Sequence, residues 1–381
     1  MKATFVSNYI NHHQIPFCDA LYRRLGEDFT FIQTEPMEEE RVRMGWGESL
    51  TALPYVKLLY EEEELCRERI RDCDLLLAGW MENPELIFDR LESGRPALRI
   101  SERIYREGQW KAVSPRGLAA KYREHIRYRN KPVYLLCAGA YVASDFTLIH
   151  AYPGKMLRFG YFPEAKRPEQ QVGKPKDGPI RLLWAGRLME LKHPEFALRL
   201  AADLRREGYD FRLKLIGGGE LEEKLKEQIQ KEELSELVEM TGFLSPQEVR
   251  LAMEESHIFL FTSNHLEGWG AVVNEAMNSR CAVVASEEAG AVPYLIRHGE
   301  NGMIYHKDRY EDFYGAVRHL LEHKKDMERM GERACETILT EWNADTAAER
   351  CLALYESWQK GNPCFPAQGP LSHAPVIRPW K

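Results

Sequence analysis

The stretch that decides the fold is Ile258-Phe259-Leu260-Phe261, followed after five intervening residues by Glu267-Gly268-Trp269-Gly270-Ala271-Val272-Val273-Asn274-Glu275. The four apolar residues predict a buried strand, and residues 271–278 predict a helix. Two glycines between them let the backbone approach a ligand closely. The unpaired N–H groups at the start of a helix attract anions. This strand, turn and helix together predict a site for an anionic ligand.

Two glutamates, Glu267 and Glu275, stand at the ends of this turn and helix. If the segment were helical throughout, they would lie about 12 Å apart along its axis. The paired carboxyl groups of a glycosidase lie about 5 to 9.5 Å apart around one bond. We therefore expect the two glutamates to contact opposite ends of one long ligand, with an anionic group between them.

Five further segments accompany this motif in a fixed order. They are Leu182–Lys192 (LLWAGRLMELK), Lys214–Glu220 (KLIGGGE), Val238–Leu244 (VEMTGFL), Val283–Ser286 (VVAS) and Gly299–Met303 (GENGM). Together with the two-glutamate motif, they resemble the retaining glycosyltransferases of the GT-B fold, most closely the large bacterial group often numbered family four. The resemblance is good from about residue 180 to 350 and much weaker over the first 160 residues.

The resemblance implies an α/β protein of the GT-B fold, with two Rossmann-like domains facing a central cleft. The expected boundaries are an acceptor-binding domain at 1–163, a polar linker at 164–178, a nucleotide-sugar domain at 179–343, a helix at 344–360 that crosses back to the first domain, and a proline-rich tail at 361–381. Five prolines exclude a helix from the last 21 residues, which are either a tail or a strap on the surface.

The apolar pattern agrees with this fold, because strand-like and helix-like segments alternate as in doubly wound parallel sheets. Expected helices include 15–25, 61–71 and 344–359. The expected strands are 3–6, 29–32, 74–78 and 132–136 in the first half, and 181–185, 212–216, 238–240, 258–261, 282–285 and 302–305 in the second.

The resemblance assigns roles to four charged residues. Glu275 is expected to bind the ribose of the nucleotide, and Glu267 the hydroxyls of the donor sugar. Arg187 and Lys192 are expected to stabilise the leaving diphosphate, which gains negative charge as the glycosidic bond breaks. Further residues expected at the nucleotide-sugar site are Gly268, Trp269, Gly270, Ala271, Val272, Gly217, Gly218, Phe243 and Leu244. No metal and no other cofactor is expected.

Each of these residues also has an ordinary structural interpretation. Glu275 could be a solvent-facing helix residue, and Glu267 a carboxylate that complements a helix N-terminus. Arg187 and Lys192 could be surface charges. Gly217-Gly218-Gly219-Glu220 is not a dinucleotide fingerprint, because the required sixth glycine is Glu222.

Candidates on the acceptor side are less specific. His12 and His13 lie in the loop after the first expected strand, where the family commonly has glycines. A histidine there could bond a phosphate or serve the acceptor, and a solvated loop histidine is an equal alternative. Glu102 is a further candidate. Asp72-Cys73-Asp74 matches a short metal-binding pattern of GT-A transferases but precedes its strand, so we expect it to be surface.

Composition limits the classes of function. The 381 residues are 44% hydrophobic and 29% charged, with a net charge of −7, as in soluble two-domain proteins. No apolar run is long enough to cross a bilayer. None of the eight cysteines forms a Cys-x-x-Cys pair, so reduced thiols and a cytoplasmic location, including the inner membrane face, are expected.

One segment departs from the acidic average. Residues 95–131 hold eleven Lys or Arg against three Glu. Within this basic island, residues 116–131 interleave cations with aromatics, which favours peripheral contact with an anionic membrane. Nucleic-acid binding gives the same charge signature but is not expected, and a solvated basic helix is the remaining alternative.

The expected function is metal-independent, retaining transfer of a hexose-type sugar from a nucleoside diphosphate sugar, with a UDP-sugar favoured, to a hydroxyl of a glycan or lipid-linked glycan. Bacterial cell-surface polysaccharide synthesis is the expected context. Two alternatives stay open: a GT-B nucleotide-sugar 2-epimerase, and a non-enzymatic protein that binds polyanions.

Overall fold

The computed structural model describes residues 1–37, 50–175, 177–307 and 309–378, which form two compact units. The N-terminal unit contains residues 1–164 and 342–378, and the C-terminal unit contains residues 165–341. Within these residues, no helix combines the length and the apolar character needed to cross a membrane. All eight cysteines are unpaired, and seven of them are buried.

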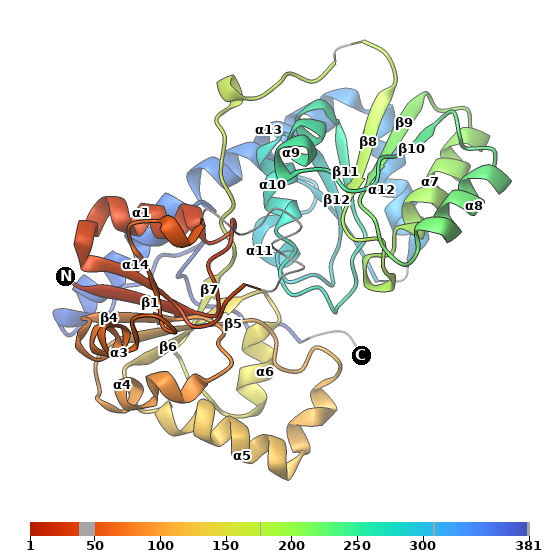
Figure 1. The fold of residues 1–381 in the computed structure, drawn as a ribbon. Helices are drawn as coiled ribbons and strands as arrows, with labels where there is room; N and C mark the ends of the chain where they lie inside the picture. The colour runs from red at the N-terminus through yellow and green to blue at the C-terminus, as the bar shows by residue number, and fades with distance from the viewer. Residues whose placement is uncertain (38–49, 176, 308, 379–381) are drawn as a thin grey trace. The chain divides into compact units, whose positions relative to one another are not determined.

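The N-terminal unit is built on a seven-stranded parallel sheet in the order β3-β2-β1-β4-β5-β6-β7. Its strands are β1 (Ala3–Ser7), β2 (Phe29–Gln33), β3 (Val56–Leu58), β4 (Leu75–Ala78), β5 (Ala97–Ser101), β6 (Val133–Ala138) and β7 (Met156–Phe159). The helices around them are α1 (Ile15–Leu25), α3 (Glu63–Asp72), α4 (Phe88–Glu92), α5 (Pro115–Glu124), α6 (Val142–Leu148) and α14 (Ala344–Gln359) (Figure 1).

Three strands of this sheet were absent from the sequence expectations. Each carries a basic residue inside a short apolar run: Lys57 in β3, Arg99 in β5 and Arg158 in β7. A charge in a four- or five-residue window breaks the continuous apolar pattern that marks a strand buried on both faces. The four expected strands and the helix at 15–25 are confirmed.

The C-terminal unit has a six-stranded parallel sheet in the order β10-β9-β8-β11-β12-β13. The strands are β8 (Ile180–Ala185), β9 (Phe211–Ile216), β10 (Val238–Met240), β11 (Ile258–Phe261), β12 (Ala282–Ser286) and β13 (Met303–Tyr305), which confirms all six expected strands. The helices are α7 (Glu195–Arg206), α8 (Glu222–Lys231), α9 (Pro246–Glu255), α10 (Val272–Asn278), α11 (Val292–Leu295), α12 (Tyr310–Glu322) and α13 (Lys324–Thr340) (Figure 1).

Both sheets reverse their strand order once. The reversal falls between β1 and β4 in the N-terminal unit and between β8 and β11 in the C-terminal unit. Loops that leave two such strands turn to opposite sides of the sheet, so a crevice opens outside their carboxyl ends. The topology therefore marks one place in each unit where a ligand can bind.

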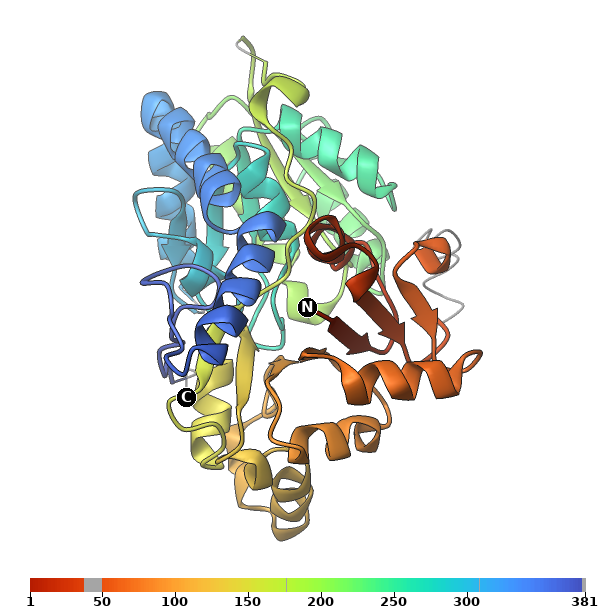
Figure 2. The same ribbon diagram turned by 90° about the vertical axis from the view of Figure 1, so that its left-hand side faces the viewer.

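The end of the described chain belongs to the N-terminal unit. Helix α14 runs beside α1 (Figure 2), and Asp345 forms ion pairs of 2.8 Å with both Arg23 and Arg24. After it, the chain pairs antiparallel with β7, with Leu371 N–H donating to the Arg158 carbonyl at 2.7 Å. Of the two alternatives for the proline-rich end, the described residues form a strap.

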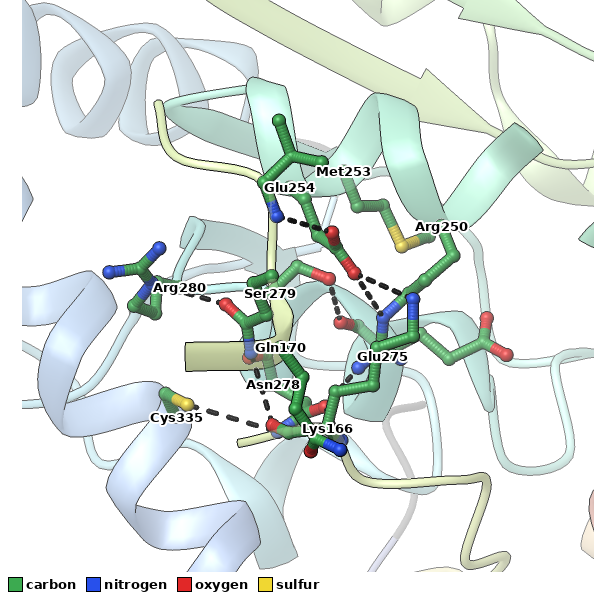
Figure 3. A network of polar contacts seen from close by, with 12 residues as sticks. Lys166, Gln170, Arg250, Met253, Glu254, Glu275, Asn278, Ser279, Arg280 and Cys335 are labelled. Atoms are coloured by element: carbon green, nitrogen blue, oxygen red, sulfur yellow. Dashed lines mark hydrogen bonds and ion pairs between the residues drawn. The ribbon is translucent and has the colours of Figure 1, made fainter. Parts of the chain in front are cut away.

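The segment expected to be a linker is attached to the C-terminal unit (Figure 3). The side chain of Asn278 accepts from the N–H of Lys166 at 2.8 Å and donates to its carbonyl at 3.0 Å. The Lys166 ammonium also pairs with the buried carboxylate of Glu254 at 3.0 Å, and the N–H of Val172 donates to the same carboxylate at 2.9 Å. Arg250 completes this network by donating to Asn278.

Asn278→Ala is expected to lower the free energy of unfolding by about 2 to 4 kcal/mol, because it removes the side-chain oxygen that accepts from the N–H of Lys166 and from the guanidinium of Arg250. Urea unfolding measures the change. The control is Gln247→Ala, since Gln247 is an exposed amide on α9 of the same unit. Equal, small losses in both variants would show that the network does not stabilise the unit.

Candidate functional site

Two of the expected site residues meet where β8 and β11 end. Lys192 closes a short 3-10 turn after β8, and Glu267 lies in the turn after β11. Their side chains form an ion pair and are 17% and 15% exposed. The pair therefore sits at the strand-order reversal, accessible to solvent on one side.

The position of Lys192 is fixed by a hydroxyl that the sequence interpretation missed. Thr262 accepts from the indole N–H of Trp184 at 2.8 Å and donates to the carbonyl of Lys192 at 2.6 Å. Trp184 and Thr262 are both buried. A tryptophan inside an apolar strand needs a hydrogen-bond acceptor for its indole N–H. Trp184 in the sequence could therefore have indicated that a nearby polar side chain accepts from it.

A second tie holds the turn that carries Glu267. The N–H of Asn264 donates to the Leu191 carbonyl at 2.9 Å, and its own carbonyl accepts from the N–H of Glu267 at 3.0 Å. One backbone hydrogen bond thus joins the loops after β8 and β11, and a second one shapes the turn that carries Glu267.

Arg187, the second expected cation, is exposed. Its guanidinium makes neither a hydrogen bond nor an ion pair with any residue that the structure describes. It follows β8 directly, as does the loop that carries Lys192. Arg187 therefore adds an exposed positive charge, unpaired among the described residues, to the loop after β8.

Glu275 is a partly buried carboxylate on α10. Burial raises the pKa of this carboxyl to about 7, and the charge of Arg250 partly opposes the shift. Within the described part of the chain, no group donates a hydrogen bond to its side chain (Figure 3). A desolvated carboxylate in this state is stabilised by any ligand that brings hydroxyl donors.

The glycine run after β9 packs against the loop after β8. A Cβ on Gly217 would lie 1.8 Å from the Gly186 carbonyl oxygen, and one on Gly219 would lie 2.5 Å from that of Leu188. Both glycines have positive φ, so no other residue fits there. Their immediate role is backbone contact between two loops of the site.

The aromatic residues expected at the site differ in exposure. The side chain of Phe243 lies against Gly218 and is 65% exposed, whereas Leu244 beside it is partly buried. Trp269 is 1% exposed, and its N–H donates to Asn274 at 2.8 Å. The side chain of Trp269 therefore packs in the protein interior. Of the contacts expected between Trp269 and a ligand, only those through its backbone are compatible with this position.

Four small residues complete the turn around Trp269. Gly270 has φ +89° and packs against the Phe261 ring. Gly268 precedes Trp269, Ala271 is the N-cap residue of α10, and Val272 is its first residue. The turn thus brings the first helical amides close to the end of β11.

The N-terminal unit holds a cavity of about 920 Å³ at the carboxyl ends of its central strands. His13 and Glu102 both line it. The ring of His13 stacks on that of Tyr161, with centroids 6.2 Å apart, and the Tyr161 hydroxyl donates to Glu102 at 2.6 Å. The structure thus brings together two residues that the sequence left 89 positions apart.

The two histidines of this loop are uncharged near neutral pH. Burial lowers the pKa of His12, and burial together with the neighbouring His12 lowers the pKa of His13 to about 3. Their rings are 3.8 Å apart. They can exchange hydrogen bonds with a ligand but supply no positive charge to a phosphate.

The Asp72–Asp74 pattern is at the surface. Asp72 pairs with Arg71 at 2.9 Å, and Asp74 accepts from the N–H of Lys2 at 2.8 Å. In the ranges that the structure covers, no group of three or more His, Cys, Asp or Glu side chains is placed to hold a metal ion.

The basic island of residues 95–131 does not form one surface. Arg103 is buried against Asp145 at 3.2 Å, and Arg127 and Lys131 both pair with Glu92. Helix α5, by contrast, buries none of its side chains. On this helix and the turn before it, Trp110, Val113, Leu118 and Tyr122 are exposed.

Comparison with known proteins identifies the segment that carries these features. Residues 165–337 match the family model described as Glycosyl transferases group 1. This segment is a group 1 glycosyl transferase domain. The match confirms the glycosyltransferase part of the resemblance drawn from the sequence motifs.

Relatives of known description match about half of the chain. The chain is 28% identical over 183 residues to the amylovoran biosynthesis glycosyltransferase AmsK of Erwinia amylovora, covering 47% of this chain and 45% of that protein. It is 28% identical over 192 residues to the alpha-D-kanosaminyltransferase of Streptomyces kanamyceticus, covering 50% and 49%. The chain spans about half the length of the curated relatives that it matches.

Solved structures resemble both units. Anabaena Alr3699/HepE, determined with UDP, gives a TM-score of 0.68 at 14% identity and covers 94% of this chain and 100% of that one. The lipopolysaccharide outer core galactosyltransferase WaaB gives 0.63 at 15% identity and covers 89% and 95%. At this identity the likeness concerns the fold, and the fold is GT-B with two Rossmann-like units.

The raised pKa of Glu275 makes the stability of the group 1 domain depend on pH. Between pH 4.5 and about 7 the folded protein holds a proton that the unfolded chain has lost, so the free energy of unfolding falls as pH rises through this window. Glu275→Gln should remove that dependence and stabilise the protein at pH 8 by about 1 to 3 kcal/mol.

Urea unfolding of wild type and variant at pH 5 and pH 8 tests this prediction. Glu227→Gln is the control, because Glu227 is an exposed helical glutamate of the same unit. If Glu275→Gln and the control change stability equally at both pH values, the carboxyl of Glu275 is not desolvated.

Proposed function

We propose that the protein is a glycosyltransferase that moves a sugar from a nucleoside diphosphate sugar, with a UDP-sugar favoured, to a hydroxyl acceptor. The observation that carries this proposal is the Lys192–Glu267 ion pair at the β8–β11 reversal, inside a group 1 glycosyl transferase domain. Cations beside a solvent-accessible turn fit a ligand with a diphosphate at its centre.

In this proposal each charged group of the C-terminal unit binds a different part of the nucleoside diphosphate sugar. The carboxylate of Glu275 accepts the two ribose hydroxyls, which supply the hydrogen bonds that it lacks. Arg187, Lys192 and the amides at 270–272 stabilise the diphosphate. Glu267, held by Lys192, accepts from hydroxyls of the sugar.

The chemical step proposed is transfer with retention. The bond between the anomeric carbon and the phosphate oxygen breaks, and the acceptor oxygen bonds to the same face of the sugar. The acceptor proton passes to the leaving phosphate oxygen. Arg187 and Lys192 contribute by stabilising the charge that develops on the diphosphate, so the route needs neither a metal nor another cofactor.

The relatives support this choice of donor and context. The Anabaena structure contains UDP, and the Erwinia relative is described by its role in amylovoran biosynthesis. We propose a glycan or lipid-linked glycan as the acceptor, in bacterial cell-surface polysaccharide synthesis. The cavity of about 920 Å³ in the N-terminal unit is large enough for a sugar.

Exposed aromatic and basic residues support a location at the cytoplasmic face of a membrane. Trp110 is 70% and Tyr122 is 60% exposed, and Arg116 and Arg123 stand on the same helix as Tyr122. Such a surface attracts anionic headgroups while its apolar rings enter the interface. We therefore keep residues 116–131 as the proposed peripheral contact.

Calorimetric titration with UDP, GDP and ADP in EDTA tests the donor site. One nucleotide should bind the wild-type protein, and Glu275→Ala should weaken its binding by about tenfold or more, because two hydrogen bonds to a charged group are lost. Glu227→Ala, at an exposed helical position of the same unit, should leave the affinity unchanged.

Either of two results would contradict the donor site. If none of the nucleotides binds, the proposal of a diphosphate site that works without a metal is wrong. Equal affinity in Glu275→Ala and wild type would remove the ribose assignment. If UDP binds and the UDP-sugar isomerises at C2 without transfer, the protein is an epimerase and the acceptor part of the proposal fails.

Lys192→Ala should lower the rate at which the enzyme releases UDP from its UDP-sugar by tenfold or more, since one charge that stabilises the leaving group is removed. Release can be followed with water as the acceptor. Lys226→Ala is the matched control, because this lysine also pairs with glutamates but lies on α8 at the surface. An unchanged rate in Lys192→Ala would exclude its catalytic role.

A further inference from the structure

One cation that lines the cavity of the N-terminal unit has no negative partner among the residues that the structure describes. The five Arg and Lys side chains that line the cavity are Arg99, Arg103, Arg106, Lys121 and Arg123. Four of them form ion pairs, namely Arg103 with Asp145, Arg106 with Glu102, Lys121 with Glu124, and Arg123 with Glu85. Arg99 forms none with any residue that the structure describes.

The contacts of Arg99 are all with neutral groups. It stands on β5 and donates through Nη1 to the backbone carbonyl of Glu124. The same nitrogen lies 3.2 Å from the hydroxyl of Tyr152 and 3.1 Å from Nδ1 of His125. The Tyr152 hydroxyl and His125 Nδ1 are themselves 2.9 Å apart, which closes the cluster.

The two side chains in this cluster stay uncharged. Burial, with the positive charges of Arg99 and Lys121, holds the pKa of His125 well below its ordinary value. Burial raises the pKa of the Tyr152 phenol. Neither side chain therefore carries a negative charge that would neutralise the Arg99 guanidinium. Its positive charge can be neutralised by a ligand in the cavity.

The free edge of Arg99 has the shape that oxyanions require. A guanidinium carries five N–H donors, and the contacts with the cluster all use Nη1. Nε and Nη2 donate to no described residue. These two nitrogens form the planar fork that binds two oxygens of a carboxylate or phosphate at once.

Partial burial makes a counter-ion more favourable at this position. Arg99 is neither fully buried nor exposed, and its charge is only partly hydrated. Removing a charge from water is costly unless an opposite charge pairs with it. The cluster of Glu124, His125 and Tyr152 holds the guanidinium in place, so a ligand meets a preorganised donor.

We propose that Arg99 binds an anionic group, a phosphate or a carboxylate, on the molecule that occupies this cavity. Given the proposed function, on which this identification rests, that molecule is the acceptor, and the acceptor carries a negative charge. His13 and Tyr161 line the same cavity and supply neutral hydrogen-bonding groups for its hydroxyls.

Ligand-detected NMR titration tests the proposal without turnover. The probes are glycerol 3-phosphate and glucuronate, each compared with its neutral counterpart, glycerol or glucose. At least one anionic probe should bind more tightly than its neutral counterpart, and Arg99→Gln should weaken that binding by about tenfold or more. Arg99→Lys, which keeps the charge but loses the fork, should give an intermediate loss.

Arg123→Gln is the matched control. It removes the same charge from the same cavity, but Arg123 is 57% exposed and faces Glu85 at 3.7 Å. It should leave probe binding unchanged. Thermal unfolding and UDP binding, which uses the other unit, establish that Arg99→Gln is folded.

The outcomes separate the sources of the anion. Preference for glycerol 3-phosphate indicates a phosphoryl group on the acceptor, and preference for glucuronate indicates an acidic sugar. Binding of neither anion above its neutral counterpart, or equal binding in Arg99→Gln, overturns the proposal. Displacement of the probe by UDP also overturns it, because the guanidinium would then serve the donor. UDP binding is measured separately, so failure of the donor site is visible independently.

Discussion

The hydroxyl of Thr262 is the contact on which the proposed donor site depends. It accepts from the indole of Trp184 in β8 and donates to the carbonyl of Lys192, so one buried group at the end of β11 joins strand β8 and the loop that follows β8. This contact holds the backbone of Lys192 against the end of β11, and the turn that carries Glu267 follows β11. The hydroxyl gives the indole N–H of Trp184 an acceptor and the carbonyl of Lys192 a donor. Replacing Thr262 would leave both groups without this partner, at a cost in stability.

The two units share a topology, but they differ in which charged groups near the strand ends are paired within the protein. In each sheet the strand order reverses, and the charged groups gather outside the strand ends. In the C-terminal unit the available charges are Arg187, exposed and unpaired among the described residues, and a pair that a ligand can rearrange. In the N-terminal unit four of the five cations that line the cavity form ion pairs, and Arg99 forms none with any residue that the structure describes. Selectivity in that cavity would therefore depend on few groups.

All six strands of the C-terminal unit were predicted. Strands β11 and β12 are fully buried along their length, which favours continuous apolar runs. Strands β8, β9 and β10 contain charged residues, and the motif segments that overlap them supported their prediction. The criterion of a continuous apolar run failed at β5, where Arg99 interrupts the pattern. That arginine is also the residue proposed to bind an anion. Lys192, Glu267 and Glu275 could be found because they belong to a motif. Thr262, Tyr161 and Arg99 could not, since their partners lie tens of residues away and only the fold brings them together.

The strap that pairs with β7 has a consequence for biosynthesis. Helix α14 and residues 371–374 complete the N-terminal unit, yet the ribosome makes them after the whole of the C-terminal unit. Until then, the edge of β7 and the face of α1 are uncovered, and open strand edges promote association between chains. Domains usually fold in the order in which they are synthesised. Here the unit whose synthesis starts first would be the last to reach its final structure, with the intervening unit already folded.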